Sequence, residues 1–262
     1  MKATILKQLD ATSGIASVTL ANPDKLNAVT AAMWRELKQV MDELHGDESL
    51  RCIVIRGEGG DFAAGGDIEE FLSLRDNYQQ AQVYHGEWVA DALQSIGACR
   101  HPCVALIQGS CIGGGLEIAG QCDLRIAGES SRFGAPIMKL GFSMAHIEMR
   151  GLLALAGAAT TLEILLEGRL LNAQEAYAKG LVTRVVADAQ VIEEAYATAR
   201  RIAAGAPLVA RCHKRLVRRL ANDPAPLSAA EEQDNFAYLD SADYREGLAA
   251  FLAKRRPQFL GR

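Results

Sequence analysis

The first half of the chain alternates between strand-like and helix-like patterns of hydrophobic residues. The segments "ATILKQL" and "IASVTL" predict a hairpin joined at Ser13–Gly14. "CIVIRG", "PCVALIQG" and "CDLRIAG" predict short buried strands, and "YQQAQVYHGEWVADALQSIGAC" predicts one long helix between the first two of them. "TAAMWRELKQVMDELH" predicts a helix with Thr30 as its N-cap, because apolar residues recur at helical spacing at Met33, Leu37, Val40, Met41 and Leu44.

The second half of the chain is mainly helical. The apolar segment "GLLALAGAATTLEILLEG" is rich in small residues, so we expect its helices to pack closely. "AQEAYAKGL" predicts a short helix stopped by Gly180, "LVTRVV" predicts a strand, and four further segments with helical spacing follow Asp188. We therefore expect a βα core over residues 1–195 and a helical C-terminal region over residues 196–262.

Composition and charge exclude several classes of protein. The 262 residues carry a net charge of −4, with the apolar and charged fractions of a soluble globular protein. The densest basic run, "RCHKRLVRRL", predicts a solvated helix face, or a site for an anionic ligand or an acidic neighbouring subunit, and not a nucleic-acid surface. The six cysteines form no CxxC pair, which indicates buried thiols in a reducing compartment and no zinc site. With neither a signal peptide nor a long apolar span found, we expect a cytoplasmic protein that does not bind membranes.

Two glycine-rich stretches share one local pattern. "GEGGDFAAGGDI" and "GSCIGGGLEIAG" each follow a short buried strand and end at a predicted helix start, and neither fits a nucleotide-binding loop. A helix N-terminus leaves backbone N–H groups without partners, and glycine removes the Cβ atom that would block a ligand. Two such termini that face one cavity would offer two donors to one oxygen, which is the geometry that holds an enolate or a tetrahedral oxyanion.

The central segment "HPCVALIQGSCIGGGLEIAGQCDLRIA" resembles the signature of the enoyl-CoA hydratase/isomerase family, also called the crotonase family. "LNAVTAAMWRELKQVMDEL", "DFAAGGDIEEF", "RFGAPIMKLG", "EGRLLNAQEAYAKGLVTRVV" and "FLAKRRPQF" resemble further family segments in the family's order. The resemblance implies an α/β fold, a crotonase-like spiral of ββα units. Its helical C-terminal region would be used in trimerisation and would cover the site. The resemblance also implies an acyl-CoA thioester substrate, no metal or other cofactor, and a homotrimer or a dimer of trimers.

The resemblance also assigns roles to individual residues. The N–H groups of Gly66 and Gly114 would bind the thioester carbonyl oxygen, and Glu117, about one helical turn after Gly114, would act as the acid/base catalyst. Alternatively, Glu117 is a buried partner of Arg125. The expected coenzyme A contacts are Lys25, Ala28, Ala63, Ala64, Gly65, Asp67, Ile68 and Lys254, although the two lysines are equally well explained as surface residues.

One position departs from the family pattern. Hydratases of this family use a second glutamate in the pattern F-G-x-P-E, but this chain reads "FGAPIMKLG", and Ile137 cannot move a proton. Glu117 would then do both jobs, or His146 or Glu148 would replace the missing acid, unless His146 caps its helix and Glu148 faces solvent. A reaction with one proton shuttle, such as double-bond isomerisation, or decarboxylation would also fit. A degenerate acyl-CoA-binding protein without catalysis is the alternative outside enzymes.

Overall fold

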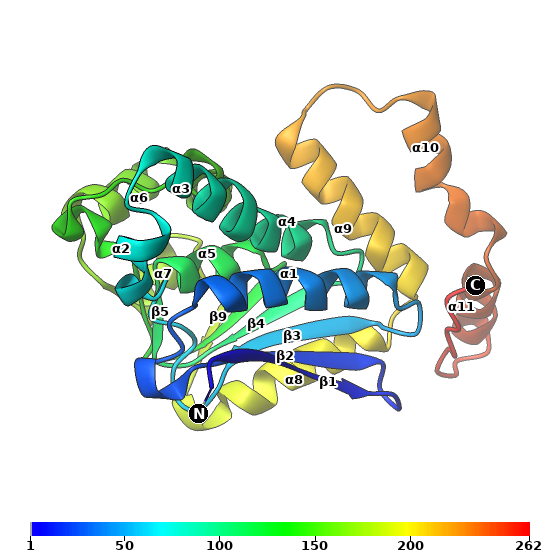
Figure 1. Cartoon of the computed structure of the whole chain (residues 1–262). Helices are drawn as coiled ribbons and strands as arrows, with labels where there is room; N and C mark the ends of the chain where they lie inside the picture. The colour runs from blue at the N-terminus through cyan, green and yellow to red at the C-terminus, as the bar shows by residue number, and fades with distance from the viewer. Residues whose placement is uncertain (1) are drawn as a thin grey trace.

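The computed structural model describes residues 2–262, which form two sheets with helices packed around them (Figure 1). The larger sheet has the strand order β1-β2-β3-β4-β6-β9 and is parallel except for the β1–β2 pair, whereas the smaller sheet has the order β5-β7-β8. The strands are β1 (Thr4–Asp10), β2 (Ile15–Ala21), β3 (Cys52–Gly57), β4 (Cys103–Ile107), β5 (Ser110–Ile112), β6 (Leu124–Gly128), β7 (Arg132–Gly134), β8 (Leu171–Asn172) and β9 (Arg184–Val186).

Helices make up most of the remaining chain. The α-helices are α1 (Ala31–Gly46), α2 (Phe71–Leu74), α3 (Tyr78–Val83), α4 (Ala90–Ala98), α5 (Gly114–Gln121), α6 (His146–Glu167), α7 (Ala173–Ala178), α8 (Val191–Ala203), α9 (Pro207–Asn222), α10 (Ala229–Asn235) and α11 (Ala242–Leu252). Short 3₁₀ segments are η1 (Pro23–Lys25), η2 (Ile68–Glu70), η4 (Pro136–Leu140), η5 (Asp188–Gln190) and η6 (Ala237–Asp240), and η3 (Tyr84–Val89) is π-helical.

The predicted hairpin, strands and first helix are confirmed. β1 and β2 pair antiparallel, and the Thr30 side chain accepts a hydrogen bond from the Met33 N–H at the start of α1. The predicted long helix is interrupted, because the π-helical η3 separates α3 from α4. A π-helical segment has a wider turn than an α-helix and therefore rotates the side chains that follow it.

The core has two layers, one on each face of the larger sheet (Figure 1). α1 and α4 cover one face, with Trp34 and Leu37 among the fully buried side chains, and α8 covers the other face. Five of the six cysteines are buried and all six are free, as expected. The expected boundary at residue 195 falls inside α8, which packs on the sheet through Val191, Ala195 and Ala199. We therefore propose that the core extends to the end of α8.

Two successive turns of the chain's spiral each supply one strand to the larger sheet, one strand to the smaller sheet, and then a helix. β4 is followed by β5 and α5, and β6 is followed by β7 and later α6. Cys111 of β5 pairs in register with Phe133 of β7, and an isolated bridge joins Cys111 to Ala63. Ala63, Cys111 and Phe133 therefore lie in one row, and residues that follow each of them by the same number of positions lie side by side. Gly66 and Gly114 each come three residues after their bridged residue, so the fold itself brings the two glycine-rich turns together.

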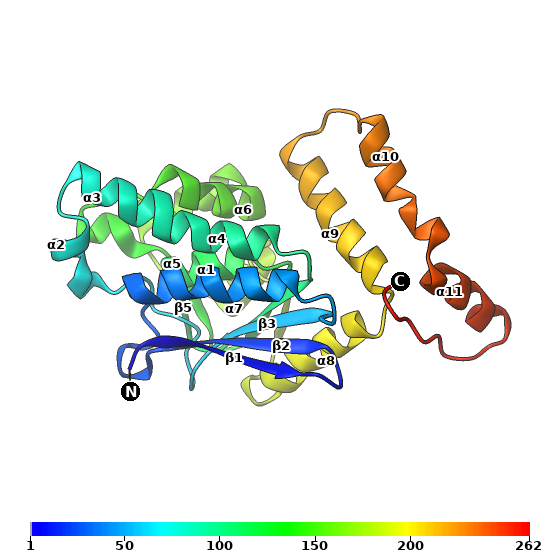
Figure 2. The same cartoon turned by 45° about the vertical axis from the view of Figure 1, so that its right-hand side comes forward.

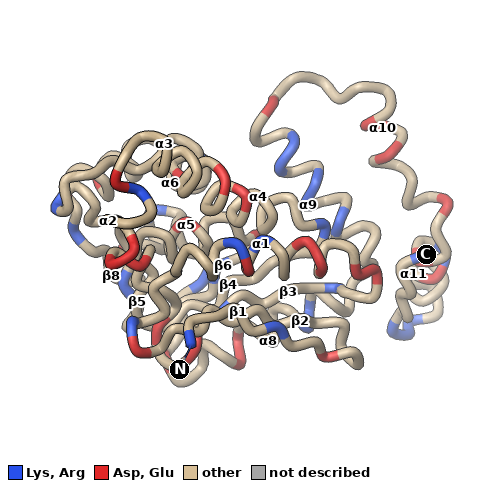
Figure 3. Tube along the Cα trace, in the orientation of Figure 1, with Lys and Arg blue, Asp and Glu red and all other residues tan. Residues whose placement is uncertain are grey.

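The C-terminal helices α10 and α11 stand away from the sheets in both views, and α9 connects them to the core (Figures 1 and 2). The basic residues on α9 (Figure 3) are paired within the chain: Lys214 and Arg218 contact Asp123 of the core, and Arg215 and Arg219 contact acidic residues of α10. The basic run predicted from the sequence is therefore largely neutralised by the chain's own carboxylates.

By length and composition alone, α6 is apolar enough to cross a membrane. Gly157, however, has φ 73° and ψ 172°, which breaks the helix near its middle. A membrane span needs about 20 consecutive helical residues, and each part of α6 is about half that length. We therefore interpret the exposed apolar surface of α6 as a protein contact surface.

Candidate active site

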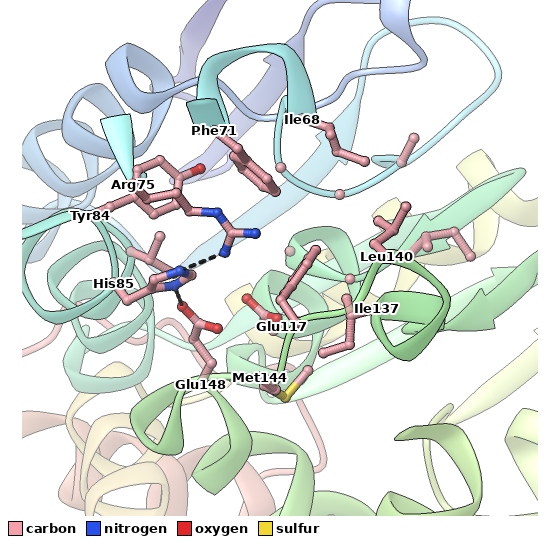
Figure 4. A pocket seen from close by; sticks show the side chains of 18 of the residues that line it. Ile68, Phe71, Arg75, Tyr84, His85, Glu117, Ile137, Leu140, Met144 and Glu148 are labelled. Atoms are coloured by element: carbon pink, nitrogen blue, oxygen red, sulfur yellow. Dashed lines mark hydrogen bonds and ion pairs between the residues drawn. The ribbon is translucent and has the colours of Figure 1, made fainter. Parts of the chain in front are cut away.

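A cavity opens between the two glycine-rich turns, α2, η3 and the start of α6 (Figure 4). Its empty space is about 680 Å³, including the mouth that is open to solvent. The walls are mainly apolar and aromatic, with a few polar groups among them. Within the described residues, no group of side chains could hold a metal ion.

The amides of Gly66 and Gly114 lie next to each other at the cavity. The Gly66 nitrogen is 3.5 Å from the position that a Cβ atom on Gly114 would occupy. Gly114 is the first residue of α5, where an N–H has no partner inside the helix, and no acceptor for the Gly66 N–H is found within residues 2–262. Pro136 holds the matching position in the next turn of the spiral and has no N–H, so this site can have two backbone donors and not three.

Glycine is required at these turns for steric reasons. Gly65 and Gly113 have φ 113° and 47°, values that side chains disfavour. A Cβ atom on Gly114 would lie 2.9 Å from Cζ2 of Trp34, and a Cβ atom on Gly66 would lie 3.3 Å from the Tyr84 hydroxyl. Trp34 and Tyr84 therefore pack against the two glycines and leave little room for a side chain at either position.

Glu117 lies in the first turn of α5, and its carboxylate points into the cavity (Figure 4). Its side chain has no hydrogen bond or ion pair within the described residues. The alternative partner, Arg125, instead donates to the carbonyl groups of Ala119 and Cys122. Burial, and then the negative charge of nearby Glu148, raise the pKa of Glu117 well above its ordinary value. Glu117 therefore tends to hold a proton where an ordinary glutamate has lost it.

Ile137 and the two auxiliary candidates occupy different environments. Ile137 lies on the cavity wall beside Leu140 and Met144, where it can only contribute apolar surface. His146 is exposed and is not among the residues that line the cavity. Glu148, in contrast, reaches the cavity from α6, and its side chain is only 6% exposed.

Two hydrogen bonds hold Glu148 in place. One carboxylate oxygen accepts from Nδ1 of His85 at 2.5 Å, and the other accepts from the Ala145 N–H at 3.3 Å. On the other side of the imidazole ring, Nη1 of Arg75 lies 2.8 Å from Nε2 of His85. Arg75, His85 and Glu148 thus form a continuous chain of hydrogen bonds along one wall of the cavity (Figure 4).

Because Arg75 can only donate hydrogen bonds, its contact with His85 determines which ring nitrogen of His85 carries the proton. A guanidinium group can only donate, so Nε2 of His85 must accept and carries no proton. The ring proton is then on Nδ1, from which it is donated to Glu148. His85 is therefore neutral, and Glu148, whose two oxygens both accept, has the bonding pattern of an ionised carboxylate. Arg75, His85 and Tyr84 are polar cavity residues that the sequence patterns do not reveal.

The expected coenzyme A residues fall into two groups. Lys25 pairs with Asp67 at 2.8 Å and with Glu69 at 2.7 Å, and the Ala64 N–H donates to the carbonyl of Leu26, so segments 25–28 and 63–68 lie together beside the glycine-rich turn. Ala64, Gly65 and Ile68 line the cavity, whereas Ala28 and Ala63 are buried behind it.

Lys254 lies elsewhere. It follows α11, which is at the opposite end of the molecule from α2 and α3 (Figures 1 and 2), and it is not among the cavity residues. Within one chain it therefore cannot join the residues of segments 25–28 and 63–68.

The spiral fold and the cavity together define the class of this protein as an acyl-CoA enzyme. The chain belongs to the enoyl-CoA hydratase/isomerase family, whose family model matches residues 10–262.

Relatives of known structure and curated relatives agree with this assignment. The fold matches an enoyl-CoA hydratase/carnithine racemase from Magnetospirillum magneticum with a TM-score of 0.96 and 46% identity, over 100% of this chain and 97% of that chain. A family protein from Hyphomonas neptunium gives a TM-score of 0.92 and 33% identity over 98% of each chain. A probable enoyl-CoA hydratase of Rhizobium meliloti is 36% identical over 94% of both sequences, and one of Mycobacterium tuberculosis is 34% identical over 99% of this chain and 98% of its own.

Proposed function

We propose that the protein hydrates a 2-enoyl-CoA thioester, with Gly66 and Gly114 as the oxyanion donors. The observation that carries this proposal is the pair of adjacent, unpartnered amides beside two carboxyl groups that line the same cavity. Two N–H donors on the thioester carbonyl oxygen stabilise the enolate that forms when water adds to the β carbon, and one such donor contributes about 3 kcal/mol in other enzymes.

The two carboxylates take different roles in this proposal. Glu148, ionised and held by His85, accepts a proton from the water that attacks the β carbon. Glu117, whose pKa is raised, gives its proton to the α carbon. Glu148 thus replaces the glutamate missing at Ile137, reaching the cavity from α6 instead of from η4.

The rest of the proposal concerns binding and assembly. Segments 25–28 and 63–68 bind the coenzyme A part of the substrate, and the reaction uses no metal or other cofactor. The protein is cytoplasmic, which fits its free, buried cysteines. It forms a homotrimer or a dimer of trimers. The large exposed apolar side chains of α6 and α11 support assembly; they include Leu162, Leu166, Phe251 and Leu252.

Isomerisation of a 3-enoyl-CoA is the second candidate, and one observation favours it. Both oxygens of Glu148 already accept hydrogen bonds, whereas the Glu117 carboxylate has no partner. A single free carboxylate can move a proton from the α to the γ carbon, which is the whole of the isomerisation.

Incubation of the protein with 2-butenoyl-CoA and, separately, with 3-hexenoyl-CoA distinguishes these reactions. Hydration adds the mass of one water to 2-butenoyl-CoA, and isomerisation changes the double-bond position without a change in mass. Glu117→Gln should lower kcat/KM by about 10²-fold or more, because it removes an acid/base group, and should leave thioester binding intact. Full activity of Glu117→Gln would remove this carboxylate from the mechanism.

A further inference from the structure

Arg75 is the charged cavity residue whose free N–H groups the proposed function leaves unused. It follows α2, and its guanidinium carbon lies 3.6 Å from the centre of the Phe71 ring and 4.1 Å from the centre of the Phe142 ring. With the hydrogen bond to His85, these ring contacts fix the guanidinium in one position. The group is therefore already ordered before any ligand binds.

Most of the donors on Arg75 have no acceptor. A guanidinium group carries five N–H bonds, and only the one to His85 has a partner among the described residues. No carboxylate lies within ion-pairing distance of Arg75 in the same part of the chain. Glu148 is the nearest acid along the hydrogen-bonded chain, but the imidazole ring of His85 stands between them. The guanidinium points into the cavity (Figure 4), so its free N–H groups face the space that an acyl group would fill.

A plain hydrocarbon chain would fit this arrangement poorly. It would displace water from the free N–H groups and give them no acceptor, and a buried donor without a partner is destabilising. An acyl group that ends in a cation would be repelled. A carboxylate fits the arrangement. It accepts two parallel hydrogen bonds from a guanidinium, so the free N–H groups gain acceptors, and it neutralises the positive charge.

We infer that Arg75 binds a carboxylate at the far end of the acyl group, so that the substrate is the monothioester of a short dicarboxylic acid. This inference rests on the proposed function, since it places the thioester carbonyl at Gly66 and Gly114. The two glycines and Arg75 line the same cavity, so one short acyl chain spans both contacts. Arg75 then has two functions: it selects the substrate, and it holds His85 in the tautomer that donates to Glu148.

Saturated thioesters test the binding step alone, because they can be neither hydrated nor isomerised. Calorimetry on the purified full-length protein compares glutaryl-CoA with pentanoyl-CoA and adipyl-CoA with hexanoyl-CoA, pairs of equal chain length. The wild type should bind the carboxylate-bearing member of at least one pair about 10- to 100-fold more tightly, the range for a hydrogen bond between charged groups. Arg75→Gln should bind both members of that pair equally. Arg245→Gln, which removes an exposed arginine of α11, should keep the preference.

Turnover separates substrate selection from the positioning of His85. In Arg75→Gln, the loss of kcat/KM should be at least tenfold greater for 2-pentenedioyl-CoA than for 2-pentenoyl-CoA. Equal losses for the two substrates would reduce Arg75 to a positioning residue and overturn the inference. Arg75→Lys, which keeps the charge, should retain part of the preference.

The remaining outcomes separate the inference from the proposed function. Equal binding within both pairs by the wild type, or a preference that survives in Arg75→Gln, would overturn the inference and leave the proposed function standing. If the wild type bound none of the four thioesters, the proposed function would fall together with the inference.

Discussion

The carboxyl groups of Glu117 and Glu148 face the same cavity but have different surroundings. Glu117 has no hydrogen-bond partner, and burial raises its pKa, whereas Glu148 accepts hydrogen bonds from His85 and from the Ala145 N–H. Environments that separate two carboxyl groups in this way identify the acid and the base. At the scale of single residues, the proposed chemistry therefore depends on the contacts of Glu148 as much as on Glu117.

The pH dependence of the reaction should report the charge on Glu148. An acid catalyst must hold its proton, so kcat/KM should fall as the pH rises through the raised pKa of Glu117. The negative charge of Glu148 contributes to that rise. In Glu148→Gln the pKa of Glu117 should therefore be lower, and the alkaline fall in kcat/KM should begin at a lower pH. Glu129→Gln, at an exposed site, is the control, and an unshifted alkaline limb in Glu148→Gln would refute the coupling.

A rescue experiment tests whether Glu148 replaces the glutamate that is absent at position 137. Glu148→Gln alone should lower the hydration rate by about 10²-fold, the usual contribution of a general base. Adding Ile137→Glu should restore part of that activity, because residue 137 lines the same cavity. Steady-state rates with a 2-enoyl-CoA measure both steps. The absence of any loss in Glu148→Gln would argue for the single-carboxylate isomerisation.

Whole elements position the backbone donors. The register of Ala63, Cys111 and Phe133 places two turns of the spiral side by side. α5 begins at Gly114, so the Gly114 N–H has no partner inside the helix and faces the cavity. The third turn has Pro136 at the matching position and cannot donate. The number of backbone donors at the cavity is thus set by the pairing of two short strands, β5 and β7, and one isolated bridge.

Substitution of one glycine should separate activity from stability. A Cβ atom on Gly114 would lie 2.9 Å from Trp34 and would push the turn away from Gly66. Gly114→Ala should therefore lower kcat by about 10²- to 10³-fold, as does the loss of one oxyanion donor. Gly120→Ala, at the other end of α5, meets no atom closer than 4.0 Å and is the matched control. Equal activity of the two variants would show that the position of the Gly114 amide is unimportant.

The sequence predicts the local parts of the site and misses the distant ones. The glycine-rich turns and Glu117 were predicted because each lies in one short segment with a recognisable pattern. Glu148 was among the candidates from the sequence, but Arg75 and His85 were not. Glu148 follows His85 by 63 residues, so only the fold brings it to the Arg75–His85 pair. "YHGEWV" reads as part of one long helix, and nothing in its spacing indicates the π-helical turn that runs over His85. The small sheet was also missed, because its strands are too short to give an alternating pattern.

At the scale of the whole molecule, the C-terminal helices leave much apolar surface uncovered. Phe251 and Leu252 of α11 are 81% and 80% exposed, and α6 has further large apolar side chains at its surface. A single chain gains nothing from such exposure, which is typical of a surface that another chain covers. This surface, rather than the sheets, is where we expect the assembly to form.

A charge placed on this surface should prevent assembly. The wild type should elute as a trimer or hexamer when its mass is measured by size-exclusion chromatography with light scattering. Phe251→Asp combined with Leu252→Asp should give monomers, because a buried unpaired carboxylate is strongly unfavourable. Leu6→Asp, on the exposed edge strand β1, is the control and should leave the mass unchanged. A monomeric wild type would contradict the proposed trimer.

The amide end of the cavity and its Arg75 end are held by different parts of the fold. Gly66 is bridged to Val29, and Ala63 is bridged to Cys111, so the amide end is tied into the β framework, whereas Arg75 sits on a short connection between α2 and α3. We therefore expect mutations at Arg75 and in the connection that follows it, residues 75–77, to change which acyl groups the cavity binds while the two amides stay in place. For protein engineers, this short connection is the first place to vary in order to change substrate preference.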